Sequence, residues 1–468
     1  RRVMKVKRIC FITAIAVLSV ICIAIVINHF YNNDKKGKET ADISQKQQAS
    51  SVESTSEEAI SISTETEKGD STDMNMNQDN VSQALQTENL EWVGTWASAQ
   101  QGLDPNRGEY PPAPGLAGNT FRQIVRISKG GPQLRLKISN EYGKTPLVLN
   151  SVHIARHYEI GYSIIMPKTD TTVTFNGGSE SVSIPPGEII CSDPIDYNAS
   201  DLERIAISIY FGDVPEIVTS HTASRTTSYL VSGNHVSDIS MESPVTNETW
   251  YFICGIDVLA SPECKAIVCL GDSITDGRGV RTNHDDRWTD VLAERLQKNP
   301  QTAHLTVLNQ GIGGNSIYGG LGPAAIKRYK RDVLDQQKVG YVIIFEAIND
   351  IGYTSSPELA DKIIEEYKKF ADQAHAQGIK VIGATITPFG GTDYAKNHWE
   401  IREGIRQKIN EWIRTTDYFD GYIDFDAAIR DEADPSIMAK KYSSDGLHPN
   451  FVGYQIMGEA IDLSLFAN

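Results

Sequence analysis

The hydrophobic pattern of this chain changes its period near Leu259, and that change constrains the fold more than any other feature. After it, short and nearly continuous apolar runs occur at 266–270, 341–345 and 381–386. Such runs are typical of parallel strands buried on both faces, and helical stretches separate them. The alternation predicts an α/β fold over residues 260–468, an α/β/α sandwich around a parallel sheet that binds ligands at the carboxyl ends of its strands.

Helices in this part can be placed from spacing and terminal signals. One is expected around 288–296, and a second is expected to begin with Ser356 as N-cap and Pro357 as its first residue and to end before Gly378. The last helix follows residue 450. It is predicted to present one apolar face made of Val452, Ile456, Ala460 and Ile461.

Residues 92–259 show the two-residue alternation of β-strands instead. Leu134, Leu136 and Ile138 alternate with basic residues, and apolar residues alternate again from Ile205 to Phe211. Each such strand is expected to bury one face. Turn signals rich in glycine and proline separate the strands, so this region is predicted to form an all-β sandwich domain.

Residues 9–27 contain no charge, glycine or proline. As a helix they would span about 28 Å, close to the hydrocarbon thickness of a bilayer. Basic residues crowd the N-terminal side, which the positive-inside rule places in the cytoplasm. We expect a single-pass membrane anchor over residues 1–33 and a catalytic part outside the cell. The alternative is a cleaved signal peptide and a secreted protein, although residues 28–31 offer no small-residue cleavage site.

Residues 34–91 hold 13 acidic residues, 5 lysines and no aromatic residue or proline. Such a segment cannot bury enough apolar surface to offset its chain entropy, so it is predicted to be a disordered stalk. The whole chain has a net charge of −16, and most of it falls on residues 92–468. An acidic folded part lacks the basic face that nucleic acid requires. No Cys/His array offers a zinc site. No metal or organic cofactor is expected.

One serine stands where a parallel strand should end. Ser273 lies in the run 271–277, GDSITDG, directly after the first predicted strand. A serine becomes a nucleophile when an imidazole takes its proton and a carboxylate orients the imidazole. Asp445 and His448 lie three residues apart on a loop before the last helix and can meet that geometry. Asp372 and His375 have the same spacing, but they lie within a helix and are predicted to be a surface pair.

Two further loops follow the next strands. The run 309–315, NQGIGGN, has paired glycines whose backbone N–H groups can approach a ligand oxygen, although a plain tight turn is an equal alternative. After the third strand, Asn349 carries a neutral amide donor suited to an oxyanion. Each signal is weak alone, whereas their order along one α/β unit is specific.

With these four marks the sequence resembles the SGNH (GDSL) hydrolase family. The resemblance implies Ser273 as nucleophile, Gly314 and Asn349 as oxyanion donors beside the Ser273 N–H, His448 as general base and acid, and Asp445 as its orienting partner. Ala347 stands where the family usually has glycine. If that position needs a positive φ, its methyl group costs on the order of 1 kcal/mol and shifts the aim of Asn349.

The likeness covers about 92–468 and extends to a two-domain branch of arylesterases and acylhydrolases of plant-polysaccharide-degrading bacteria. It implies a serine esterase acting on short-chain esters, acetyl first, of a small molecule or polysaccharide, and the predicted anchor places this esterase outside the cytoplasm. The alternatives are a lipase or phospholipase, and a non-catalytic carbohydrate-binding surface protein. The sequence does not define an oligomeric state.

Three charged residues near the nucleophile remain to be placed. Asp276 and Arg278 could shape the substrate pocket, as could Arg287, or all three could form ordinary salt bridges within loops. Cys254 and Cys264 could pair outside the cell, whereas Cys269 falls within a predicted buried strand.

Overall fold

The structure is a computed structural model that describes residues 89–106, 108 and 112–467. The predicted membrane anchor over 1–33 lies outside these residues, and so does the predicted stalk over 34–91 except for its last three residues. Within the described ranges, no helix combines the length and the apolar character needed to cross a membrane.

The first part of the described chain consists of antiparallel strands in three sheets. One sheet has the order β1-β15-β4-β8, with β9 also paired to β4; the second has the order β13-β12-β3-β10-β5-β6, with β7 paired to β5; the third is β14-β11-β2. Their bounds are β1 (Glu91–Ala97), β2 (Gln101–Leu103), β3 (Asn119–Arg126), β4 (Gly131–Ser139), β5 (Leu147–Arg156), β6 (Thr171–Val173), β7 (Val182–Ile184), β8 (Ile189–Cys191), β9 (Ile195–Ala199), β10 (Arg204–Phe211), β11 (Val218–Thr222), β12 (Ser228–Ser232), β13 (Val245–Asn247), β14 (Thr249–Tyr251) and β15 (Ile253–Ala260), with a short 3₁₀ turn η1 (Pro167–Thr169).

The burial of these strands follows the predicted alternation only in part. In β4, Leu134, Leu136 and Ile138 are buried and the basic residues between them are not, as expected. The prediction of one buried face is wrong for β10, where Ala206 and Ser208 on the other face are buried as well. A second, smaller hydrophobic cluster that includes Ala206 covers that face.

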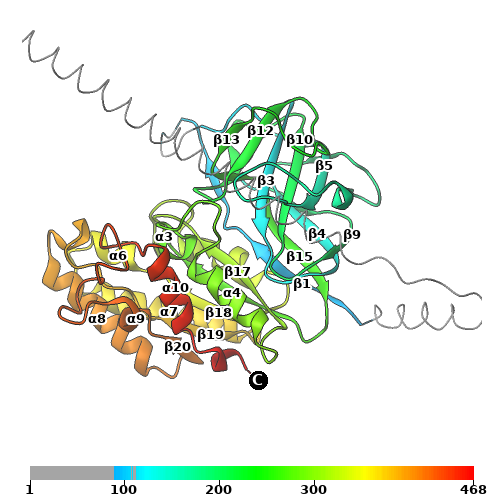
Figure 1. Ribbon diagram of the computed structural model, residues 1–468. Helices are drawn as coiled ribbons and strands as arrows, with labels where there is room; N and C mark the ends of the chain where they lie inside the picture. The colour runs from blue at the N-terminus through cyan, green and yellow to red at the C-terminus, as the bar shows by residue number, and fades with distance from the viewer. Residues whose placement is uncertain (1–88, 107, 109–111, 468) are drawn as a thin grey trace, which may run out of the picture. The chain divides into compact units, whose positions relative to one another are not determined.

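The C-terminal part contains the predicted parallel sheet, with the strand order β17-β16-β18-β19-β20 (Figure 1). All four neighbouring pairs run parallel. The strands are β16 (Lys265–Gly271), β17 (Leu305–Gly311), β18 (Val339–Phe345), β19 (Lys380–Ala384) and β20 (Gly421–Ile423). Because Gly271 pairs with both Gly311 and Phe345, the adjacent strands β17, β16 and β18 end at one level of the sheet.

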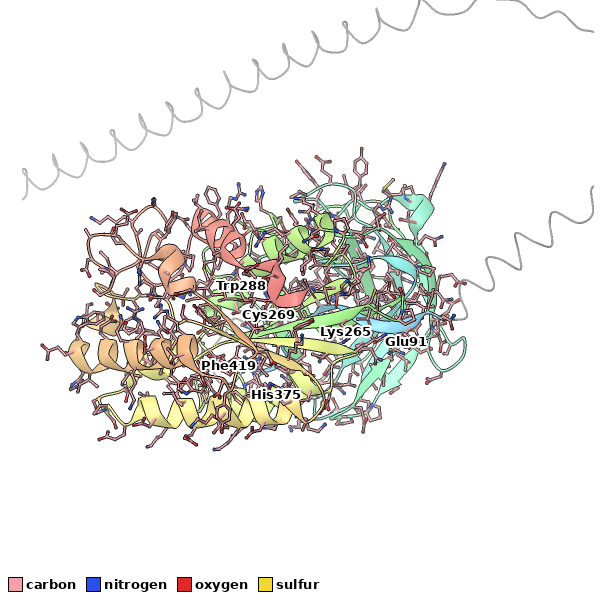
Figure 2. The ribbon with its side chains drawn as sticks, turned by 90° about the horizontal axis from the view of Figure 1, so that it is seen from below. Glu91, Lys265, Cys269, Trp288, His375 and Phe419 are labelled. Atoms are coloured by element: carbon pink, nitrogen blue, oxygen red, sulfur yellow. The ribbon has the colours of Figure 1, made fainter. Side chains whose placement is uncertain are left out.

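Helices cover both faces of this sheet. They are α3 (Ser273–Asp276), α4 (Trp288–Lys298), α5 (Ala325–Tyr329), α6 (Ile348–Tyr353), α7 (Leu359–His375), α8 (Trp399–Thr415), α9 (Phe425–Ile429) and α10 (Phe451–Ala460), with the short turns η2 (Lys330–Leu334), η3 (Asp393–Ala395) and η4 (Leu463–Phe466). Figure 2 shows α4, with Trp288, and α10 on one face, and α7, which ends at His375, and α8 on the other. The predicted α/β/α layering is therefore present.

The start of α7 differs from the prediction. The helix begins at Leu359 with Glu358 as its N-cap, so Ser356 and Pro357 precede it in a turn. The Leu359 N–H still donates to the Ser356 carbonyl, at 3.2 Å. A proline can start a turn as readily as a helix, which is why the sequence signal misplaced this end by about one half-turn.

The predicted apolar face of α10 is wrong for two of its four residues. Val452 and Ala460 are exposed, whereas Ile461 is buried and Ile456 packs against the core. The buried residues within the helix are Gly453, Tyr454, Met457 and Gly458. A Cβ at Gly458 would lie 2.5 Å from the side chain of Val291 on α4. Gly458 thus lets the two helices approach closely, and a pattern of large apolar residues does not reveal a contact made by glycine.

One continuous hydrophobic core connects the antiparallel and parallel parts. Strand β1 lies beside β17. The Gly94 N–H donates to the Gln337 carbonyl at 3.1 Å, and the Thr306 hydroxyl donates to the Gly94 carbonyl at 2.5 Å. The β-rich part is therefore packed against the parallel sheet and contributes to its support.

Candidate active site

The candidate nucleophile lies on a one-turn helix at the end of a central strand. Strand β16 ends at Gly271, and α3 begins at Ser273. The Asp272 carboxylate caps the turn by accepting the Ile274 N–H at 2.8 Å. Ser273 is 7% exposed, so its hydroxyl lies at a partly covered surface. The strand-to-helix turn fixes this serine at the carboxyl edge of the sheet.

The structure brings together the three residues that the sequence predicted as a triad. Ser273 Oγ lies 3.0 Å from His448 Nε2, and His448 Nδ1 lies 2.8 Å from Asp445 Oδ2. The other Asp445 oxygen accepts the backbone N–H groups of Leu447 and His448 at 2.9 and 2.8 Å. A short loop thus presents the carboxylate and the imidazole together, which explains why a spacing of three residues is sufficient.

Electrostatics give the two partners suitable protonation states. Burial alone would raise the pKa of Asp445, but hydrogen bonds from His448 and Leu447 outweigh it and hold that pKa at about 2. Burial lowers the pKa of His448 below its ordinary value, the Asp445 carboxylate opposes the shift, and Arg278 and Arg225 add to it. Near neutral pH the carboxylate is ionised and the imidazole is free to accept a proton.

Two loops at the ends of the strands on either side of β16 hold the candidate oxyanion donors. Asn349 lies in the first turn of α6, and Gly314 lies in the loop after β17. Asn349 Nδ2 donates one hydrogen bond to the Asn315 carbonyl at 2.7 Å, which leaves its second N–H. Among the described residues, no partner accepts from the backbone N–H of Ser273 or Gly314. These three donors come from the ends of three adjacent strands.

Ala347 has the strained conformation that its position suggested. Its φ is 101° and it is fully buried, just before α6. An L-residue with a Cβ rarely adopts this region, whereas glycine does so freely. Asn349 nevertheless lies within the network described above, so the methyl group does not prevent the amide from reaching its partners.

A buried charged cluster that the sequence did not indicate lies beneath the strand ends. The fully buried Arg328 donates to the carbonyl groups of Gly271 and Gln310 at 2.9 and 2.7 Å, and its Nε donates to the Asn315 side chain at 2.9 Å. Its guanidinium also lies 3.5 Å from Glu346, whose pKa burial raises well above its ordinary value. Arg328 thereby ties the end of β16 to the end of β17 and its loop.

The β-rich part also reaches the nucleophile turn. His221 Nε2 lies 2.9 Å from Asp276 Oδ1, and both side chains are buried. Arg225 Nη2 lies 3.6 Å from the other Asp276 oxygen, and Arg287 donates to the Asp276 carbonyl at 2.7 Å. Asp276 is therefore an anchor of the turn, buried beyond the reach of a substrate. Arg287 forms internal hydrogen bonds, which the sequence analysis gave as the alternative to a role in the substrate pocket. Arg278 is exposed.

An open cleft of about 640 Å³ lies beside the triad. Its lining is mostly polar or small, with Leu447 as its one aliphatic residue. The lining residues are Gly352, Tyr353, Gly391, Thr392, Asp393, Tyr394, Asn397, Arg402, Asp445 and Leu447. Tyr394 was missed by the sequence analysis because η3 carries no motif; the signal available was a tyrosine in a polar loop after a strand.

The remaining predicted residues lie away from this site. His375 is exposed and bonds to Asp420, at 2.9 Å, so the Asp372–His375 spacing is not a second acid–base pair. Cys254 and Cys264 are free thiols that are not bonded to each other. Across the part of the chain that the structure describes, no cluster of His, Cys, Asp and Glu side chains could hold a metal ion.

An α/β/α sandwich with a Ser–His–Asp array at the carboxyl edge of its sheet is typical of serine hydrolases. Residues 269–456 match the model of the GDSL-like lipase/acylhydrolase family. The C-terminal part of this chain is therefore a GDSL-like lipase/acylhydrolase (SGNH) family domain, and the protein is an esterase.

Similar solved structures include a GDSL-like lipase from Bacteroides thetaiotaomicron, at 20% identity over 43% of this chain and 88% of that chain, with a TM-score of 0.31. A member of the lipolytic protein G-D-S-L family from Veillonella parvula has 17% identity over 42% of this chain and 96% of its own, with a TM-score of 0.31. An acetylxylan esterase from Geobacillus stearothermophilus has 20% identity over 43% of this chain and 93% of its own, with a TM-score of 0.34. No curated protein matches the chain.

Proposed function

We propose that this protein is a serine esterase that removes short acyl groups, acetyl first, from carbohydrate esters through an acyl-enzyme. The observation that carries the proposal is the unbroken chain from Ser273 Oγ through His448 to the Asp445 carboxylate, at 3.0 and 2.8 Å. Hydrogen bonds at these distances allow the proton of the serine to pass to the imidazole as the hydroxyl oxygen attacks.

In the first half of the reaction, Ser273 Oγ attacks the acyl carbonyl and its proton passes to His448 Nε2. The carbonyl oxygen becomes an oxyanion, which accepts from the Ser273 and Gly314 N–H groups and the free N–H of Asn349. When the tetrahedral intermediate collapses, His448 gives its proton to the departing alcohol oxygen. The acyl group is then bonded to Ser273.

In the second half, water takes the place of the alcohol. His448 accepts a proton from the water, whose oxygen attacks the acyl carbonyl, and the same donors hold the second oxyanion. Collapse breaks the bond to Ser273 Oγ, which regains its proton from His448, and the carboxylic acid leaves. Asp445 stays ionised throughout and holds His448 Nδ1–H, so the imidazolium is stabilised in each half.

The lining of the cleft supports short acyl groups. Each buried CH₂ of a longer chain would add about 0.8 kcal/mol of binding if an apolar groove received it. The cleft beside the triad offers one aliphatic side chain, Leu447. Long chains would therefore gain little binding energy there. Tyr353, with 78% of its surface exposed, offers instead a ring face of the kind that packs against a sugar.

We also propose that the enzyme acts outside the cell, tethered through residues 9–27. The support is the apolar length of that segment and the basic residues before it. Cell fractionation tests this proposal: the full-length protein should remain with the membranes, and a variant without residues 1–33 should be soluble and active. A full-length product found in the medium with a trimmed N-terminus would indicate a cleaved signal instead.

The decisive experiment for the activity combines one variant with one substrate series. Ser273→Ala should keep its melting temperature and lose nearly all esterase activity, because the covalent route needs the hydroxyl. With the wild-type enzyme, kcat/KM should fall steeply from p-nitrophenyl acetate to the dodecanoate, and acetate should be released from an acetylated polysaccharide. Full activity in Ser273→Ala would refute the mechanism. A preference for dodecanoate without acetate release would favour a lipase.

A further inference from the structure

The Asn349 amide is held at both ends. Its nitrogen donates to the Asn315 carbonyl at 2.7 Å, and since a carbonyl only accepts, the other amide atom must be the oxygen. The Tyr394 hydroxyl lies 2.5 Å from that oxygen and therefore donates to it. The planar amide is thus fixed by two bonds on opposite sides, and the second N–H is left for the substrate.

The hydroxyl of Tyr394 has one proton, and its geometry assigns that proton to Asn349. The Tyr353 hydroxyl lies 3.4 Å from the Tyr394 oxygen, so in that pair Tyr353 is the donor. Burial and the neighbouring Tyr353 raise the pKa of Tyr394 well above its ordinary value, so the phenol remains a donor at any pH at which the enzyme works.

Neighbouring groups lock the Tyr394 side chain in place. Its ring lies over Gly352, where an added Cβ would come within 2.3 Å of a ring carbon. The Tyr353 ring packs against it edge to face, with centroids 5.1 Å apart. Arg402 donates to the Tyr394 carbonyl at 2.7 Å and to the Thr354 carbonyl at 2.8 Å, which joins η3 to the end of α6. The phenol is therefore pre-positioned against Asn349.

We propose that Tyr394 is a positioning residue of the oxyanion hole, which acts on the reaction through its hydrogen bond to Asn349. This inference rests on the proposed serine esterase function and adds to it a residue outside every motif of the sequence. Tyr394 need not touch the reacting atoms. Its role is to hold the amide plane so that the free N–H points to the place where the oxyanion forms.

The two ends of the amide also reinforce each other. A donor on the oxygen draws electron density from the nitrogen, which makes the remaining N–H a stronger donor. The benefit is greatest when the substrate oxygen carries a full negative charge, because the neutral ester carbonyl of the bound substrate is a weak acceptor. Loss of the Tyr394 hydroxyl should therefore lower kcat far more than it changes KM.

The test uses Tyr394→Phe in the full-length protein, with acetate ester kinetics and thermal unfolding. Removing a whole oxyanion donor costs about 10²- to 10³-fold in kcat, so a weakened and misaimed donor should cost about tenfold. KM should stay within about twofold, and the acid limb of the pH profile should not move because His448 is unchanged. The matched control is Tyr329→Phe, which removes a buried hydroxyl bonded to the Phe370 carbonyl at 2.9 Å, away from the site, and should keep kcat.

A double-mutant cycle with Asn349→Ala separates positioning from a general structural role. If Tyr394 acts through Asn349, Tyr394→Phe should have no further effect on kcat in the Asn349→Ala background. A second readout is inhibition by benzeneboronic acid, whose tetrahedral adduct with Ser273 mimics the oxyanion. Its inhibition constant should rise about tenfold in Tyr394→Phe, whether or not turnover can be measured.

An unchanged kcat and an unchanged boronate affinity in Tyr394→Phe would overturn the inference. So would a fall in kcat that is equally large when Tyr394→Phe is introduced into the wild-type protein and into Asn349→Ala. These results differ from a failure of the proposed function. In that case the wild-type protein would have no esterase activity and would not bind the boronate at all.

Discussion

Removal of His221 should destabilise the protein and disturb the nucleophile turn, although this residue lies in the β-rich part. His221 Nδ1 lies 2.8 Å from the Ala99 carbonyl and Nε2 lies 2.9 Å from the Asp276 carboxylate. The Ala99 carbonyl can only accept, so Nδ1 donates to it, and Nε2 faces the buried Asp276 carboxylate. His221→Ala would leave the carboxylate buried without its main partner.

The expected magnitude follows from burial. The side chains of His221 and Asp276 are 6% and 2% exposed, and breaking such a buried pair costs about 3–5 kcal/mol. Arg225 at 3.6 Å and an adjacent cavity of about 60 Å³, large enough for water, offset part of the loss, so we expect about 3 kcal/mol. For a folded part of roughly 380 residues, unfolding entropy is on the order of 0.8 kcal/mol per K, and the melting temperature should fall by about 4 °C.

Differential scanning calorimetry and acetate ester kinetics measure both effects. The double variant His221→Ala/Asp276→Asn should lose less than the sum of the two single variants, because the two residues share one interaction. The control is His235→Ala, which breaks a surface pair with Asp238 and should change the melting temperature by less than about 1 °C. A His221→Ala protein with unchanged melting temperature and kcat/KM would refute this account of the interface.

Three further predictions concern the site itself. Activity should rise with pH as His448 loses its proton, with a midpoint below the ordinary histidine pKa of about 6.5, while Asp445 stays ionised. Arg278→Gln removes a positive charge that lowers the pKa of His448, so it should shift the kcat/KM profile to higher pH at low ionic strength. Single-turnover assays should show that Asp445→Asn retains more activity than His448→Ala, because the base remains. An Ala→Gly change in a buried element usually lowers the free energy of unfolding by about 1 kcal/mol. Ala347→Gly should instead keep or raise the melting temperature measured by calorimetry, because glycine adopts the φ of 101° without strain.

The sequence was sufficient to predict that Ser273, His448 and Asp445 lie together, because each lies next to an element that local patterns reveal. Ser273 follows a continuous apolar run, and parallel strands must end at one edge of the sheet. Asp445 and His448 are three residues apart, so a single loop places them together. The same reasoning predicted the parallel sheet and its helices, since both follow from local hydrophobic period.

The residues that support the triad could not be predicted in this way. Arg328 binds three segments around the strand ends, and Tyr394 reaches Asn349 from 45 residues away. Neither has neighbours in sequence that reveal its partners, because the contacts arise from packing. Asp276 shows the converse error: proximity to Ser273 in sequence suggested a substrate contact, whereas burial against His221 makes it an anchor.

The supporting contacts show why the antiparallel and parallel parts should be regarded as one functional unit. The nucleophile turn is held from within the sheet by Arg328, which binds the Gly271 carbonyl, and from the β-rich part by His221, which binds the Asp276 carboxylate. Arg287, the N-cap of α4, donates to the Asp276 carbonyl and also to the Ser224 carbonyl, at 2.6 Å, so it joins the turn to the β-rich part. Because a displacement of about 1 Å in the nucleophile can lower the rate a hundredfold, these anchors bear on catalysis as well as on stability.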